Sequence, residues 1–143
     1  MSNWREKGLA CGLLVLRVLA GAGIAYHGYG KVFGGHMDRF AAGVAAMGLP
    51  LPGFFAWAAA LSELVGGICL ALGLGTRMAA LLILATMLVA AFGKHAGDPF
   101  GKRELALMYG TAALTLLLTG PGKMALDTLL GGWLFWRRKT ERK

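Results

Sequence analysis

Hydrophobic and polar residues follow one another along this chain in long blocks rather than residue by residue. Four apolar runs stand out, at residues 9–29, 54–74, 78–92 and 105–119. Each run approaches the ~20 residues that a helix needs to cross ~30 Å of hydrocarbon. The runs are continuous and rich in Gly and Ala, which is typical of membrane helices and not of membrane β-strands. We therefore expect an all-α membrane protein, a bundle of four transmembrane helices.

The segments between the runs predict how these helices connect. Residues 32–52 include a mixed stretch, 37–47, followed by Gly48-Leu49-Pro50-Leu51-Pro52, which stops a helix, so we expect a short surface helix in this first outer loop. The turn Gly73-Leu74-Gly75-Thr76-Arg77 offers a glycine C-cap and then a threonine N-cap, which makes the flanking helices antiparallel neighbours.

The last apolar stretch, residues 124–136, reaches only ~20 Å as a helix and is too short to span. Trp133 and Trp136 lie beside a basic tail and are typical of an interfacial anchor. We expect residues 124–143 to form an interfacial segment and a basic cytoplasmic tail, within a single transmembrane domain that covers residues 1–143.

Composition and charge support this interpretation. The chain has 143 residues, of which 57% are hydrophobic, and a mean hydropathy of +0.60, which excludes an ordinary soluble enzyme of this size. The net charge of +8 includes five basic residues in the last seven, so it favours a membrane-orienting tail over nucleic-acid binding. Nine Lys and Arg residues fall on the side of the two termini and five on the other side, which places both termini in the cytoplasm.

Two ionisable residues fall inside the apolar runs, Arg17 and Glu63. Each costs about 2.5–3.5 kcal/mol in hydrocarbon and should face protein. Counted from the ends of their antiparallel runs, both lie near mid-depth, so we expect an intramembrane ion pair between them. Such a pair could be purely structural, or it could be a charged centre for a proton or a ligand.

A second group of polar residues is expected at the outer rim of the bundle. Its members are ionisable or aromatic side chains that suit a ligand-binding site: Tyr26, His27, Lys31, His95 and Glu104. The alternative is that the lysine only extends to the interface and that Glu104 only complements a helix N-terminus. No metal site or haem is expected, because the chain lacks a set of well-spaced ligands.

Several short motifs, in this order and spacing, resemble the DoxX family of small bacterial membrane proteins. These motifs are Arg17 with Tyr26-His27-Gly28-Tyr29-Gly30-Lys31, then residues 48–52, 63–67 and 72–77, the start of the last apolar run at Glu104, and Gly120-Pro121-Gly122-Lys123-Met124-Ala125-Leu126-Asp127. The resemblance implies a four-helix protein of the bacterial inner membrane. It also implies a link to membrane oxidoreductases, including quinone-reducing thiosulfate enzymes that contain a related subunit.

The functional hypothesis that follows is a membrane subunit or accessory protein of a quinone-linked oxidoreductase system. A quinone needs an apolar slot with a few hydrogen-bonding groups, which the rim residues could supply. No catalytic motif, redox dithiol or nucleotide fingerprint is identified. Partner oxidoreductase subunits or a homo-oligomer are therefore expected besides the lipid bilayer. A non-catalytic assembly subunit and a small transporter stay open as alternatives.

Overall fold

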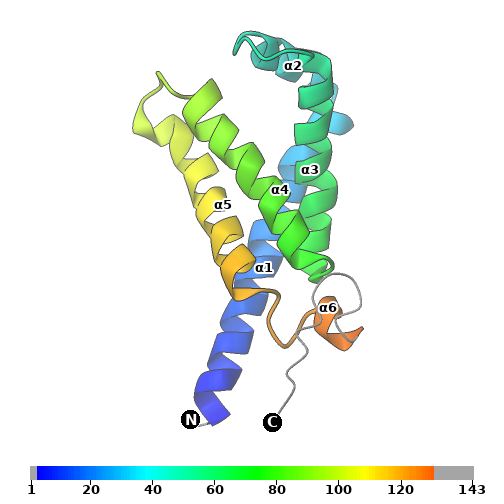
Figure 1. Cartoon of the computed structure of the whole chain (residues 1–143), viewed down its shortest axis with the longest axis vertical. Coiled ribbons are helices and arrows are strands. Elements are labelled where there is room, and N and C mark those ends of the chain that lie inside the picture. Colours follow the sequence, from blue (N-terminus) through cyan, green and yellow to red (C-terminus); the bar gives the residue numbers. More distant parts are fainter. Residues whose placement is uncertain (1–2, 131–143) are drawn as a thin grey trace, which may run out of the picture.

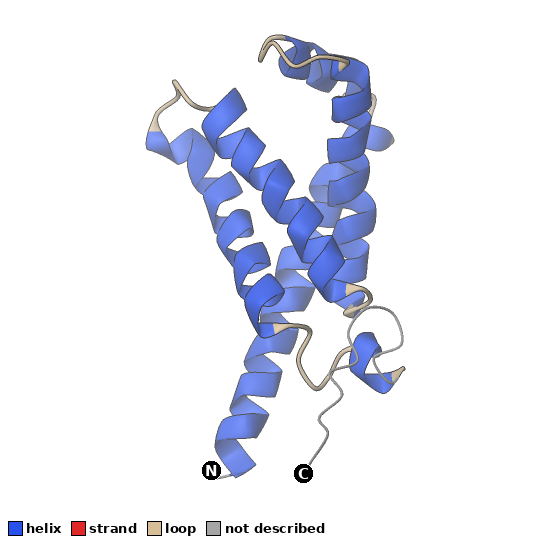
Figure 2. Ribbon diagram, viewed as in Figure 1, coloured by secondary structure: helices blue, strands red, loops and turns tan. Residues whose placement is uncertain are grey.

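In a computed structural model, residues 3–130 are described, and all regular elements in that range are helical (Figures 1 and 2). The elements, in chain order, are α1 (Asn3–Val32), α2 (Met37–Ala45), α3 (Pro52–Leu72), α4 (Thr76–Val89), η1 (Ala90–Lys94), α5 (Phe100–Thr119) and α6 (Leu126–Leu129). The four long helices coincide with the four apolar runs. The segments Trp4–Val32, Pro52–Leu72 and Thr76–Lys94 are long and apolar enough to cross a membrane.

The long helices pack in a ring of neighbours, with α1 on α3, α3 on α4, α4 on α5, and a smaller contact between α5 and α1. Figure 1 shows the start of α1 and α6 at one end of the molecule and α2 at the other. We call these the α6 end and the α2 end. Two connections lie at the α2 end: the one from α1 through α2 to α3, and the one from η1 to α5. Several of the predicted site residues are therefore at that end.

The seam between α1 and α3 depends on glycine. A Cβ on Gly67 would lie 2.6 Å from Ala25 N and 2.7 Å from Gly21 O, which is closer than real Cβ contacts come. A Cβ on Gly21 would lie 2.5 Å from Ala71 N. The two helices therefore meet backbone to backbone, as small residues allow in membranes. This seam fixes their register.

Side chains from α1, α3, α4 and α5 form the core of the bundle. Its fully buried members include Ile24, Leu70, Ile83 and Leu116. Many large apolar side chains lie on the outside, for example Leu19 with 68% of its surface exposed. Lipid covers such a surface in a membrane protein, so the distribution agrees with the membrane location that the hydropathy indicates.

Two details differ from the sequence prediction. Helix α1 has 30 residues, about 45 Å, and is longer than the run at 9–29 because its polar first turns are also helical. Thr76 is the first residue of α4 and not its N-cap, which is Gly75. The glycine C-cap of α3 is confirmed, since Gly73 has a φ of 73°. Trp133 and Trp136, the predicted interfacial anchor, lie outside the described residues.

Candidate functional site

Glu63 is paired with Lys31. The Lys31 ammonium on α1 donates to both carboxylate oxygens of Glu63 on α3, each at 2.5 Å. The Glu63 side chain is 4% exposed and that of Lys31 is 24% exposed. The backbones are close here because Gly28, one turn before Lys31, packs directly on the backbone of Leu64. A buried charge in a membrane bundle requires a partner of this kind.

The expected Arg17–Glu63 pair is not formed, and Arg17 binds backbone carbonyls at the α6 end. Its guanidinium donates to Pro121 O at 3.0 Å and to Met124 O at 2.8 Å. Arg17 is 2% exposed, and among residues 3–130 its Nε has no hydrogen-bond partner. The guanidinium also lies against Gly73, at the end of α3. Arg17 therefore joins the loop after α5 to the turn between α3 and α4.

The register of the α1–α3 seam explains this difference. Gly21 faces Gly67 and Ala71, whereas Gly28 faces Glu63 and Leu64. The sequence numbers of two residues that face each other across the seam thus add up to about 92. By this rule, Arg17 lies about three helical turns along α1 from the position that faces Glu63. The prediction aligned the two apolar runs end to end, but in this register α1 extends past the end of α3, so Arg17 lies beside the end of α3 and not beside Glu63.

Asp127 is a second residue that holds the turn, and the sequence reasoning did not single it out. Its carboxylate accepts hydrogen bonds from Gly75 N at 2.7 Å, from Thr76 N at 2.9 Å and from Thr76 Oγ1 at 2.9 Å. It therefore caps α4 from a distant part of the chain, where a negative charge is favourable. An acidic residue in an apolar segment just after Gly120-Pro121-Gly122 was the available signal.

The predicted rim residues are divided among separate places. Lys31 belongs to the pair with Glu63. His95 lies 2.7 Å through Nδ1 from Asp98 Oδ2, in the turn between η1 and α5. This contact, with Lys102 nearby, holds the pKa of the Asp98 carboxyl below its ordinary value of 3.8. Glu104 lies exposed on the first turns of α5.

His27 and Tyr26 lie on α1, where His27 faces α5. The His27 ring packs edge-on against Tyr109, with ring centroids 5.9 Å apart. The Tyr109 hydroxyl in turn lies against Gly23. Gly23 and Tyr109 therefore mark one level on α1 and α5, which run in opposite directions. From this level toward the α2 end, His27 lies ~6 Å further along α1. Glu104 lies ~7.5 Å further along α5 in the same direction. His27 and Glu104 are therefore at a similar depth, while Tyr26 is 77% exposed.

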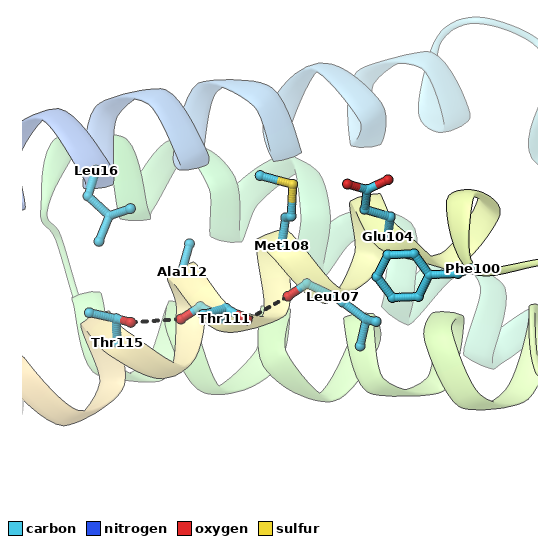
Figure 3. A pocket seen from close by; sticks show the side chains of 8 residues that line it. All are labelled: Leu16, Phe100, Glu104, Leu107, Met108, Thr111, Ala112 and Thr115. Atoms are coloured by element: carbon cyan, nitrogen blue, oxygen red, sulfur yellow. Dashed lines mark hydrogen bonds between the residues drawn. The ribbon is translucent and has the colours of Figure 1, made fainter.

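A groove of about 390 Å³ runs along α5 beside α1, and Glu104 is its charged residue. Figure 3 shows its lining, in which Leu16 comes from α1 and all other residues come from α5. The α5 residues are Phe100, Glu104, Leu107, Met108, Thr111, Ala112 and Thr115. The two threonine hydroxyls donate to the backbone of their own helix, to Leu107 O and Thr111 O, so they add little polarity.

The groove thus combines a long apolar wall with one carboxylate near the α2 end. Among residues 3–130, no group of three or more His, Cys, Asp and Glu side chains is placed to hold a metal ion. The volume lies within the range of small-molecule sites, and the apolar lining suits a flat or elongated lipophilic ligand. Glu104 can accept a hydrogen bond or a proton from such a ligand.

These features are those of a small helical membrane protein, and comparison with known families identifies which one. The DoxX family matches residues 12–96. The chain belongs to the DoxX family, which confirms the resemblance that the motifs indicate.

Two relatives match most of the chain. One is the "Putative oxidoreductase CatD" of Bacillus subtilis (strain 168), 33% identical over 125 residues, which are 85% of this chain and 89% of the relative. Another is the "Inner membrane protein YqjF" of Escherichia coli (strain K12), 33% identical over 124 residues, which are 83% of this chain and 92% of the relative. No solved structure matches the chain significantly.

Proposed function

We propose that this DoxX-family protein crosses the bacterial inner membrane four times, with α1, α3, α4 with η1, and α5 as the spans. Helix α5 has 20 residues, about 30 Å, which supports its inclusion. The α6 end faces the cytoplasm in this proposal, because most Lys and Arg residues outside the spans belong to that side. Helix α2 then lies on the outer surface, and the segment after α5 lies at the inner interface.

Reporter fusions test this topology. Alkaline phosphatase, active outside, and green fluorescent protein, active inside, are fused after residue 48, after residue 97 and at the C-terminus. Phosphatase activity at the first two positions and fluorescence at the third are expected. Fluorescence at residue 97 would remove α4 as a span, and phosphatase activity at the C-terminus would remove α5 as a span.

We further propose that the protein is a membrane subunit or accessory protein of a quinone-linked redox system, and that the groove beside α5 binds the quinone. The observation that supports this proposal is the apolar groove, in which Glu104 supplies the one charged side chain. The isoprenoid tail would lie against Leu16 and Met108. The ring would lie near Phe100, with a hydroxyl of the reduced form donating to the Glu104 carboxylate.

The proposed chemistry requires a proton acceptor and an electron acceptor. Oxidation of a quinol releases two protons and two electrons, and Glu104 takes the first proton from the bound hydroxyl. His27 lies at a similar depth on α1, against Tyr109 of α5, and is suited to receive the second proton. A partner oxidoreductase subunit takes the electrons. A relative named as a putative oxidoreductase supports the redox assignment.

Photolabelling of the purified protein tests the groove directly. A short-chain azidoquinone should label the peptide that contains residues 100–115. Ala112→Trp, which fills the groove, should abolish this labelling. Ala85→Trp places the same ring on an exposed position of α4 that does not line the groove, and it should label like the parent. With the azidoquinone reduced to its quinol form before photolysis, Glu104→Gln should weaken labelling by about tenfold, because it removes the charge-assisted hydrogen bond from the quinol hydroxyl.

A non-catalytic assembly subunit is the second candidate. It is favoured by the fact that both deeply buried ionisable side chains, Arg17 and Glu63, have structural partners within the described chain. Labelling that is equal in the parent and in Ala112→Trp would refute the quinone site. Copurification of a stoichiometric membrane partner would then support the assembly role.

A further inference from the structure

The α2 end contains a second group of charged residues, away from the groove. The ammonium of Lys31 lies 4.3 Å from the centre of the Phe40 ring on α2, and that of Lys94 lies 5.8 Å from the same centre. The two ammonium nitrogens are therefore no more than 10.1 Å apart, the sum of these distances. Both lie within the range of cation–π attraction to one ring.

The backbone is arranged so that Lys94 reaches this ring. Lys94 ends the π-helical turn η1, in which His95 N donates to Ala90 O at 3.1 Å. Such π-helical turns are frequent at functional sites. The Cε atom of Lys94 lies 3.9 Å from the position that a Cβ on Gly43 of α2 would take. The lysine stem is thus held against α2.

The charges at this place do not cancel. Glu63 neutralises Lys31, but Lys94 lacks an acidic partner within 4 Å among the residues that the structure describes. The group of Lys31, Lys94 and Glu63 therefore carries one net positive charge. Lys31 keeps 24% of its side chain exposed, so an outside ligand can also reach it.

The position of these lysines along the helices indicates what the ligand is. Lys31 and Lys94 stand at or next to the ends of two candidate spans, Trp4–Val32 and Thr76–Lys94. Lysines at span ends place their ammonium groups at the depth of lipid headgroups. A phosphate-type oxyanion is the abundant anion at that depth, and lysine binds it as a compact point charge.

We propose that Lys94, Lys31 and the α2 ring of Phe40 form a binding site for a singly charged phosphate oxyanion, supplied by the headgroup of an anionic phospholipid. The oxyanion lies beside the ring, against the Lys94 ammonium and the exposed part of Lys31, and balances the net charge of the group. Bound lipid then holds α2 against η1. This site is independent of the quinone groove.

Native mass spectrometry of the full chain in detergent tests the site. The protein is titrated with phosphatidylglycerol and with phosphatidylcholine, which carries the same phosphodiester but no net charge. The parent should retain one phosphatidylglycerol more tightly than phosphatidylcholine. Lys94→Gln should weaken that binding by about fivefold, the effect of one lysine at a membrane surface. Lys102→Gln, which removes another exposed lysine charge, on α5, should leave it unchanged.

A competition arm separates the two sources of oxyanion. Inorganic phosphate that binds the parent, displaces the lipid and loses affinity in Lys94→Gln would support the same site filled from solution. Equal losses in Lys94→Gln and Lys102→Gln would show attraction to net charge alone and overturn the proposal. So would a parent that binds both lipids equally. Phe40→Leu should also weaken binding, because it removes the ring while keeping an apolar side chain.

Discussion

The Lys31–Glu63 pair gives the sharpest stability prediction. Lys31→Met leaves the Glu63 carboxylate, 4% exposed, with neither water nor a cation, and this should cost about 3–5 kcal/mol. Glu63→Met leaves the ammonium of Lys31, which is 24% exposed and has the Phe40 ring beside it. Glu63→Met should therefore lower the free energy of unfolding only by the contribution of a hydrogen bond to a charged group, about 1.5–3 kcal/mol. The lysine variant should therefore be the less stable of the two.

The double variant should recover much of this loss. Two methionines at this contact leave no buried charge, and paired apolar replacements of buried ion pairs are often nearly neutral. Equilibrium unfolding in mixed micelles of sodium dodecyl sulfate, followed by circular dichroism, measures all four proteins. The coupling free energy should exceed about 1.5 kcal/mol. If the two single effects add within about 0.5 kcal/mol, the pair does not stabilise the fold and the reasoning fails.

Arg17 provides the matched control for this cycle. It is a buried cation on the same helix, but its hydrogen bonds go to Pro121 O and Met124 O. Arg17→Met should destabilise the protein, and Glu63→Met should not rescue it. If Glu63→Met did rescue Arg17→Met, Arg17 and Glu63 would have to form an ion pair, and the assignment of Lys31 as the partner of Glu63 would be wrong.

Three further predictions concern the seam, the helix cap and the loop. Gly67→Ala should destabilise the protein by about 1–3 kcal/mol because its methyl group would push α1 from α3, whereas Gly12→Ala, with open space around it, should be neutral or stabilising in the same unfolding assay. Asp127→Ala should cost about 1–2 kcal/mol in that assay because α4 loses its cap, and Asp127→Asn should cost less. The lowered pKa of Asp98 means that its contact with His95 stabilises the fold above pH 3.8 and less as the pH falls through the folded-state pKa. Asp98→Asn should therefore lower the melting temperature at pH 7 and have a smaller effect near pH 3.

The helices could be predicted from the sequence because hydropathy is a local property. The run at 54–74 became Pro52–Leu72 and the run at 105–119 became Phe100–Thr119, with differences only at the ends. The glycine at 73 also has a local signature, since a helix that ends in the left-handed region favours that residue.

The partners of the buried charges could not be predicted in the same way. Pairing depends on the register between helices, and the α1–α3 register is set by backbone contact at Gly21 and Gly67 rather than by where an apolar run begins. A shift of about three turns was enough to exchange Arg17 for Lys31 as the partner of Glu63. The α4 cap supplied by Asp127 depends on a contact between residues 51 apart in sequence, which no local pattern encodes.

The glycine seam has a mechanical consequence. At Gly21, Gly28 and Gly67 no side chain lies between the two backbones to compress or reorient, so we expect α1 and α3 to move together as one rigid unit. Helices α4 and α5 form a second unit. At the α6 end, Asp127 holds the first residue of α4 and Arg17 holds the loop that follows α5. With the pivot at the Gly73–Gly75 turn, the same angular motion gives the largest displacement at the α2 end. Glu104 lies toward that end, so we expect such a motion to displace the Glu104 carboxylate more than the part of the groove near Leu16.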